Sequence, residues 1–206
     1  LCVVLSGCTG FTYQNINELL RAPALGGGMD EIQKALTEYL DGTEAQYKYP
    51  KEGEWRSPIL QADLNGDGTT EAIVLYGLPD TTKSRYAHVA LLEQVEGEWQ
   101  VVQNLEGVAS EVASLETADL LGDGTRQLVV GYSSAVKTLA LYTYDGEVLG
   151  QVFQRVYSRY EVGDFTGRGG NDMVVVAGEP GPNMPEYILS RIHIRRCRRS
   201  RMFKCR

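Results

Sequence analysis

A ten-residue segment rich in aspartate and glycine occurs three times in this chain, and an apolar run follows each copy. The copies span 62–71, 118–127 and 163–172. Their leading aspartates, Asp63, Asp119 and Asp164, are 56 and 45 residues apart. A period of roughly 40 to 50 residues is typical of chains that arrange copies of one small unit in a row. The repeat therefore limits the possible folds more than any local propensity does.

Short runs of β-branched, aromatic and aliphatic residues fill the intervals between the copies, as expected of strands. They are 72–76, 86–92, 99–105 and 112–117 in the first interval, and 128–132, 138–144, 148–156 and 160–162 in the second. Glu96-Gly97 and Asp145-Gly146 occur where tight hairpin turns need positive φ. We expect an all-β fold with four antiparallel strands per repeat, as in the blades of a β-propeller, over residues 57–190. Two complete repeats and the start of a third would form an incomplete ring.

The segment before the first repeat has helical rather than strand spacing. Residues 15–22 and 29–40 fit helices, and Ile32, Leu36 and Leu40 share one face of the second. Three glycines, 26–28, separate the two. We expect a tether over 8–28, then a helical segment and lead-in over 29–56 that packs beside the first blade.

The first repeat loop has the pattern of a calcium site. Asp63, Asn65, Asp67 and Glu71 place side-chain oxygens at positions 1, 3, 5 and 9, and Thr69 offers a carbonyl at position 7. Calcium takes six to eight oxygen ligands, and alternate residues of a tight loop converge on one point. An EF-hand also needs a glutamate at position 12, where this chain has valine, and it needs flanking helices rather than strands.

The second loop keeps part of this pattern. Asp119, Asp123 and Thr125 remain, but Leu121 and Gln127 replace the oxygen donors at positions 3 and 9. We expect a weaker metal site here.

The third loop departs further, because Arg168 stands at position 5 between Asp164 and Asp172. A cation at this position opposes a calcium ion, so we expect no metal. For all three loops the alternative is that the aspartates only accept hydrogen bonds from backbone amides in Asx turns.

The pattern Asp-x-Asn-Gly-Asp-Gly-x-x-Glu and the strand after it resemble the FG-GAP or VCBS-type repeat proteins over residues 62–178. The resemblance implies β-propeller blades like those of integrin α-subunits and calcium as a cofactor. It further implies that the loop with Asp63, Asn65, Asp67, Thr69 and Glu71 joins two strands of one blade. The segment 18–23 and the helix after it resemble lipoproteins of Gram-positive bacteria.

The start of the chain resembles the end of a bacterial lipoprotein signal peptide. Leu5-Ser6-Gly7-Cys8 matches a lipobox and follows an apolar stretch. The resemblance implies that residues 1–7 are the remainder of a truncated signal peptide and that Cys8 receives a diacylglyceryl group. The protein would then be extracytoplasmic and anchored to the bacterial membrane by this lipid. The alternative is a buried first strand with a free thiol.

The charge is unevenly distributed along the chain. The protein has 20 lysines and arginines against 27 acids, a net charge of −7. Eight of the cations lie in 191–206, so residues 1–190 carry −15. This acidity argues against nucleic acid as a partner. The basic tail, 191–206, fits either a coding artefact or an anion-binding patch.

Motifs for catalysis are missing from the sequence. No Gly-x-Ser-x-Gly, His-Glu-x-x-His or phosphate-binding glycine loop occurs. We expect His88 to be a surface strand residue rather than a general base. Acids such as Asp80, Glu93 and Glu111 could pair for glycosidase chemistry. For five strand tyrosines we expect core or inter-blade packing rather than a sugar-stacking platform; they are Tyr76, Tyr86, Tyr132, Tyr142 and Tyr144.

These patterns favour a lipid-anchored module of the cell envelope with calcium-stabilised propeller repeats. It would act by binding or as a scaffold, with an envelope glycan or protein as ligand, and not as an enzyme. Two alternatives stay open. One is a part of an extracytoplasmic carbohydrate-active enzyme whose catalytic residues lie on lost sequence or on a loop such as 78–85. The other is a structural spacer.

Overall fold

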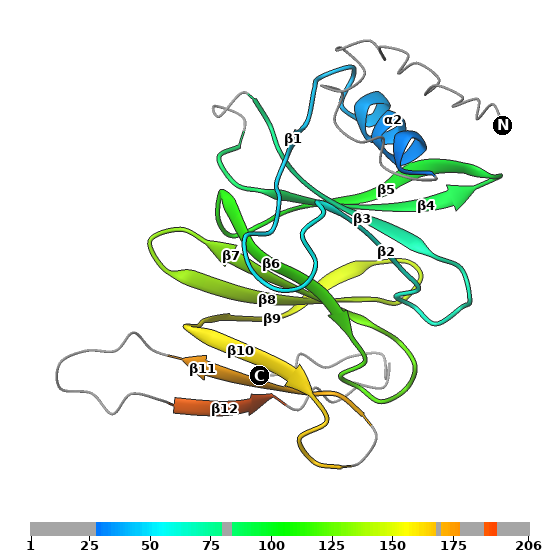
Figure 1. Ribbon diagram of the computed structural model, residues 1–206. Helices are drawn as coiled ribbons and strands as arrows, with labels where there is room; N and C mark the ends of the chain where they lie inside the picture. The colour runs from blue at the N-terminus through cyan, green and yellow to red at the C-terminus, as the bar shows by residue number, and fades with distance from the viewer. Residues whose placement is uncertain (1–27, 80–83, 168–169, 178–187, 193–206) are drawn as a thin grey trace, which may run out of the picture.

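The protein is mostly β. A computed structural model describes residues 28–79, 84–167, 170–177 and 188–192. In this part of the chain one helix precedes three antiparallel sheets (Figure 1). The elements are α2 (Met29–Tyr39), β1 (Gln46–Tyr47), β2 (Ile59–Ala62), β3 (Glu71–Gly77), β4 (His88–Val95), β5 (Glu98–Glu106), β6 (Glu111–Ala118), β7 (Gln127–Ser133), β8 (Lys137–Tyr144), β9 (Leu149–Val156), β10 (Arg159–Gly163), β11 (Asp172–Ala177) and β12 (Ile188–Ile192).

The first sheet contains β1 to β5, with β3 and β4 at its centre. One edge of β3 pairs with β2 from Glu71 to Val74 and then with β1 at Tyr76 and Gly77, while its other edge pairs with β4. The β4–β5 hairpin turns at Glu96 and Gly97, both with positive φ (55° and 87°), as expected from the sequence. β1 lies in the segment that we expected to be only a lead-in, and it adds two residues to this sheet.

The second and third sheets are simple meanders, β6-β7-β8-β9 and β10-β11-β12. This differs from the expected grouping, in which the four strands between two aspartate loops formed one unit. β6, the last strand of that interval, pairs with β7 across the next loop. The shorter connection, 107–110, instead leads from β5 in the first sheet to β6 in the second. Each aspartate loop therefore joins the first two full-length strands of its sheet.

The helix and the sheets lie one on another, with an apolar core at each junction (Figure 1). Ile32 and Leu36 of α2 pack on one face of the first sheet, beside Val74 and Tyr76. Leu75 and Leu91 on its other face meet the second sheet. The second sheet in turn packs on the third through a core that includes Leu139, Leu141, Met173 and Val175.

Strands in the middle of this stack are buried on both faces, so they do not alternate between apolar and polar residues. All seven residues of β3 are buried. The same holds for the start of β4, and our expectation for His88 was wrong because this side chain is buried there. Tyr86 is 46% exposed, which corrects our expectation of packing for that tyrosine. The other four strand tyrosines are buried, as expected.

The helix expected over 29–40 is confirmed as α2, which ends at Tyr39 with Leu40 as its C-cap. Its buried residues are Ile32, Ala35 and Leu36. The expected helix over 15–22 and the lipidation site Cys8 lie outside the described residues. β12 continues past residue 190 to Ile192, into the segment that we separated as a basic tail. Among the described helices, none has the length and apolar character required to cross a membrane.

Candidate metal centre

The three aspartate loops lie next to one another. They are defined here as the first loop (63–71), the second loop (119–127) and the third loop (164–172). The amide of Arg126 in the second loop donates to the carbonyl of Leu64 in the first (3.0 Å). The amide of Asn171 in the third donates to the carbonyl of Asp119 in the second (3.2 Å). Each aspartate loop is therefore in direct backbone contact with the next one.

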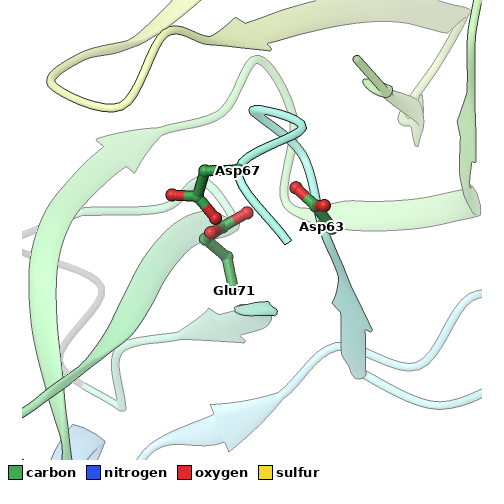
Figure 2. Close-up of side chains that lie close together, drawn as sticks. All are labelled: Asp63, Asp67 and Glu71. Carbon is green, nitrogen blue, oxygen red and sulfur yellow. The ribbon is translucent and has the colours of Figure 1, made fainter. Parts of the chain in front are cut away.

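Three carboxylates of the first loop come together. One oxygen each from Asp63, Asp67 and Glu71 lies within 4.8 Å of the others (Figure 2). Calcium binds oxygens at about 2.3 to 2.6 Å, so two ligands of one ion are at most about 5 Å apart. The spacing of the three carboxylates is therefore compatible with one bound metal ion.

The backbone of the first loop is tightly turned around Asp63. This carboxylate accepts hydrogen bonds from the amides of Gly66 (2.6 Å) and Gly68 (3.0 Å). Both glycines have positive φ, 78° and 89°, which residues with a side chain rarely adopt. The amide of Asp67 donates to Oδ1 of Asn65 (2.9 Å). Both glycines are thus needed for the turn that brings positions 1, 3 and 5 together.

Asp67 and Glu71 differ in their surroundings. Asp67 is exposed, and hydrogen bonds from the hydroxyl and amide of Thr69 hold its pKa below the ordinary value. Glu71 is buried and accepts a hydrogen bond from the amide of Leu64 (2.7 Å). Burial raises the pKa of Glu71, and the carboxylates of Asp67 and Asp63 raise it further. A bound cation would favour the ionised form of Glu71.

The second loop repeats the same hydrogen bonds with fewer charges. The amide of Leu120 donates to Oε1 of Gln127 (2.7 Å), just as the amide of Leu64 donates to Glu71. An amide side chain thus closes this turn as well as a carboxylate does. The negative charge of Glu71 is therefore not required by the turn, and this is the sharpest difference between the two loops.

The remaining predicted ligands of the second loop bond to their own backbone. Asp119 accepts from the amides of Gly122 (2.6 Å) and Gly124 (3.0 Å), and Asp123 accepts from the amide of Thr125 (3.1 Å). Within the described residues, only the first loop gathers three potential acidic ligands.

In the third loop, Thr166 bonds to both acids. Its amide donates to Asp164 (3.2 Å) and its hydroxyl to Asp172 (3.0 Å). The expectation for Arg168 falls outside the described residues.

Comparisons with known proteins neither support nor contradict the resemblance to the repeat family. No family model matches this chain. A search of curated proteins also finds no match.

Two acids beside the first loop were not expected from the sequence as part of this site. A cavity of about 760 Å³ adjoins the loop, and Glu93 of β4 and Glu31 of α2 also line it. The hydroxyl of Tyr144 donates to Glu93. Because Glu93 is distant from the loop in sequence, only the pairing of β3 with β4 brings it near Glu71.

The three acids considered for glycosidase chemistry have separate environments. Glu93 accepts the bond from Tyr144, and Glu111 forms ion pairs with Lys48 (3.0 Å) and Lys51 (3.2 Å). Asp80 lies outside the described residues. These contacts give no support to a catalytic pair.

Proposed function

We propose that this protein is a binding or scaffold module of the bacterial cell envelope, built from propeller-type blades of the FG-GAP or VCBS kind. Calcium in the first loop stabilises it, and a lipid on Cys8 anchors it to the membrane. The second loop is a weaker metal site.

The difference between Glu71 and Gln127 carries the calcium proposal. Both side chains accept the same backbone hydrogen bond, but only Glu71 adds a buried charge next to two other carboxylates. Gathering like charges in a partly buried site is unfavourable unless a cation compensates them. A turn that served structure alone would not need this charge.

Calcium in this site has a structural role. The ion would hold β2 and β3 together at the loop that joins them. The bond from Arg126 to Leu64 connects this loop to the second sheet, so the ion would also strengthen the junction of the two sheets. Metal binding to the folded state raises its stability by mass action.

The arrangement of the sheets supports the blade proposal. Each of the last two sheets is an antiparallel meander, the sheets pack face to face, and the equivalent loops adjoin one another. The lipobox resemblance and the acidity of residues 1–190 support a place at the envelope rather than on nucleic acid.

The test is binding of the purified full chain to isolated Gram-positive cell walls, measured by co-sedimentation with and without 2 mM calcium. We expect the protein to sediment with the walls when calcium is present and to sediment less in excess chelator. A protein that stays in the supernatant under both conditions would contradict the binding role.

A further inference from the structure

A cavity of about 850 Å³ opens where one strand of each of the three sheets contributes to a common wall. Residues from β2, β6 and β10 line it, and the segment 52–55 and Phe165 complete its wall. Its volume is in the range of small-molecule sites, about 300 to 1,000 Å³. The first loop does not line this cavity, so it is distinct from the candidate metal centre.

The strands that face this cavity have free edges within the described part of the chain. β2 pairs only with β3, β6 only with β7, and β10 only with β11. One contact crosses the edge of β6, where the amide of Glu52 donates to the carbonyl of Ala113 (2.7 Å). Two further carbonyls on these strands already accept side-chain donors, that of Ile59 from the indole of Trp55 and that of Thr117 from the guanidinium of Arg126. Strand edges carry backbone amides and carbonyls that can bond a polar ligand.

Two aromatic rings in the wall are unusually exposed. Trp55 is 39% exposed and Phe165 is 51% exposed. The indole N–H of Trp55 donates to the carbonyl of Ile59 (3.2 Å), which fixes the ring and leaves no donor for a ligand. Phe165 lies against Gly163, where its ring is 3.5 Å from the position of a Cβ. Both side chains thus offer ring faces rather than polar groups.

Polar side chains in the same wall are held in place by the protein. The guanidinium of Arg126 donates to the hydroxyl (2.9 Å) and the carbonyl (3.0 Å) of Thr117. The hydroxyl of Tyr160 donates to Ser114 (2.9 Å). Glu116 adds carboxylate oxygens to the same wall. Groups held in this way lose little entropy when a ligand binds.

The charges of the wall disfavour an anionic ligand. Glu52, Glu54, Glu116 and Glu161 outnumber the two arginines even when the pairing of Glu52 with Lys137 (2.5 Å) is counted, and Arg159 lies 3.7 Å from Glu161. Carboxylates are strong acceptors for hydroxyl groups, and the negative face of an aromatic ring attracts weakly positive C–H groups. A sugar ring presents both kinds of group, since its hydroxyls project from its rim and its C–H bonds from its faces.

We propose that this cavity binds a neutral carbohydrate, with the sugar ring stacked on Trp55 or Phe165 and its hydroxyls bonded to Glu116 and Arg126. This proposal rests on the binding role proposed above and names its site and ligand class.

Tryptophan fluorescence provides a direct assay, because the chain has only two tryptophans. Trp55 lines the cavity, whereas Trp99 is buried in the core between α2 and the first sheet. The full chain is titrated with the tetramer of N-acetylglucosamine, with cellotetraose and with mannotetraose. We expect at least one of the three to change the emission of wild type and of Trp99→Phe, but not of Trp55→Phe.

Affinities of site variants are then measured by calorimetry with the oligosaccharide that binds. Trp55→Ala, Phe165→Ala and Glu116→Gln should each weaken binding about tenfold or more. Tyr86→Ala is the matched control, because this exposed tyrosine does not line the cavity. Circular dichroism melts confirm that each variant folds.

The outcomes separate this proposal from the binding role. If none of the three oligosaccharides binds at millimolar concentration, or if a hyaluronan tetramer or tetralysine binds more tightly, the carbohydrate assignment is overturned. If the cavity variants bind walls and oligosaccharide as wild type does, the site is wrong while the binding role stands. Failure of wild type to bind walls would overturn the role itself, whatever the oligosaccharides do.

Discussion

Replacing Glu71 with glutamine should remove calcium binding without unfolding the first loop. The glutamine can accept the hydrogen bond from Leu64 just as Gln127 accepts the bond from Leu120. The substitution removes one of the three carboxylates that lie within 4.8 Å of one another. It therefore tests the charge and leaves the turn in place.

The size of the calcium-dependent stabilisation follows from the thermodynamic linkage between metal binding and folding. Extracellular calcium modules bind with Kd of about 10⁻⁴ to 10⁻³ M. At free calcium tenfold above Kd, binding stabilises the folded state by about 1.4 kcal/mol. For a chain of this size that corresponds to a rise in Tm of roughly 3 to 6 °C. Wild type should show this rise, and Glu71→Gln should show almost none.

Without calcium, wild type should lose its advantage in Tm over Glu71→Gln. Burial raises the pKa of Glu71, so holding it ionised at neutral pH costs folding free energy that glutamine avoids. Glu71→Gln in chelator should therefore melt at or above the Tm of wild type in chelator. A variant that melts well below wild type in chelator would show that the turn needs the carboxylate, contrary to our reasoning.

Asp123→Asn in the second loop is the matched control for this experiment. Asp123 occupies position 5, like Asp67, and accepts from the amide and hydroxyl of Thr125. This variant should keep most of the calcium-dependent rise in Tm. The reasoning fails if calcium raises the Tm of wild type and Glu71→Gln equally in thermal melts followed by circular dichroism.

Further predictions concern the second loop, the packing of the second sheet and the anchor. The double variant Leu121→Asn, Gln127→Glu should strengthen the weak site of the second loop, so that calorimetry shows tighter calcium binding there than in wild type; an unchanged affinity would contradict the assignment of ligands. Gly131→Ala should lower the free energy of unfolding by about 1 to 3 kcal/mol in urea titrations, because its Cβ would lie 2.3 Å from a serine hydroxyl, whereas Gly150→Ala has open space and should have little effect. Cys8→Ala, expressed in a Gram-positive host from the intact gene, should move the protein from the membrane fraction to the medium; retention in the membrane would refute lipidation as the anchor.

The gathering of three carboxylates in the first loop could be predicted from the sequence because it is local. Asp63, Asp67 and Glu71 lie within nine residues, and the two glycines between them leave few ways to turn the chain. The positions of most strands could also be predicted from the sequence, because each of these strands is a short run of strand-forming residues with turn residues at its ends. The carboxylate geometry and most strand positions therefore follow from short-range rules.

What the sequence did not reveal depends on contacts between distant segments. The order of the strands is visible in the chain, but the pairing of β6 with β7 instead of β5 is not. His88 is polar and lies in a strand, which favours exposure, yet α2 and the second sheet cover both faces of β4. The cavity beside Trp55 and Phe165 draws on three strands that only the stacking of the sheets brings together.

A comparison of the three loops distinguishes the hydrogen bonds that shape the turn from the carboxylate charge that calcium binding would need. Asp63 and Asp119 each accept the backbone amide three residues on, and Asp164 accepts the amide two residues on, so a local bond to the leading aspartate is common to all three loops. The charge at position 9 is not common, since glutamine closes the second loop. The shared bonds can therefore set the shape of each loop with or without an ion, and calcium would add stability only where the acids exceed what the turn requires. On this reasoning the ion tunes the junction between the first two sheets, and its removal should loosen that junction before it unfolds either sheet.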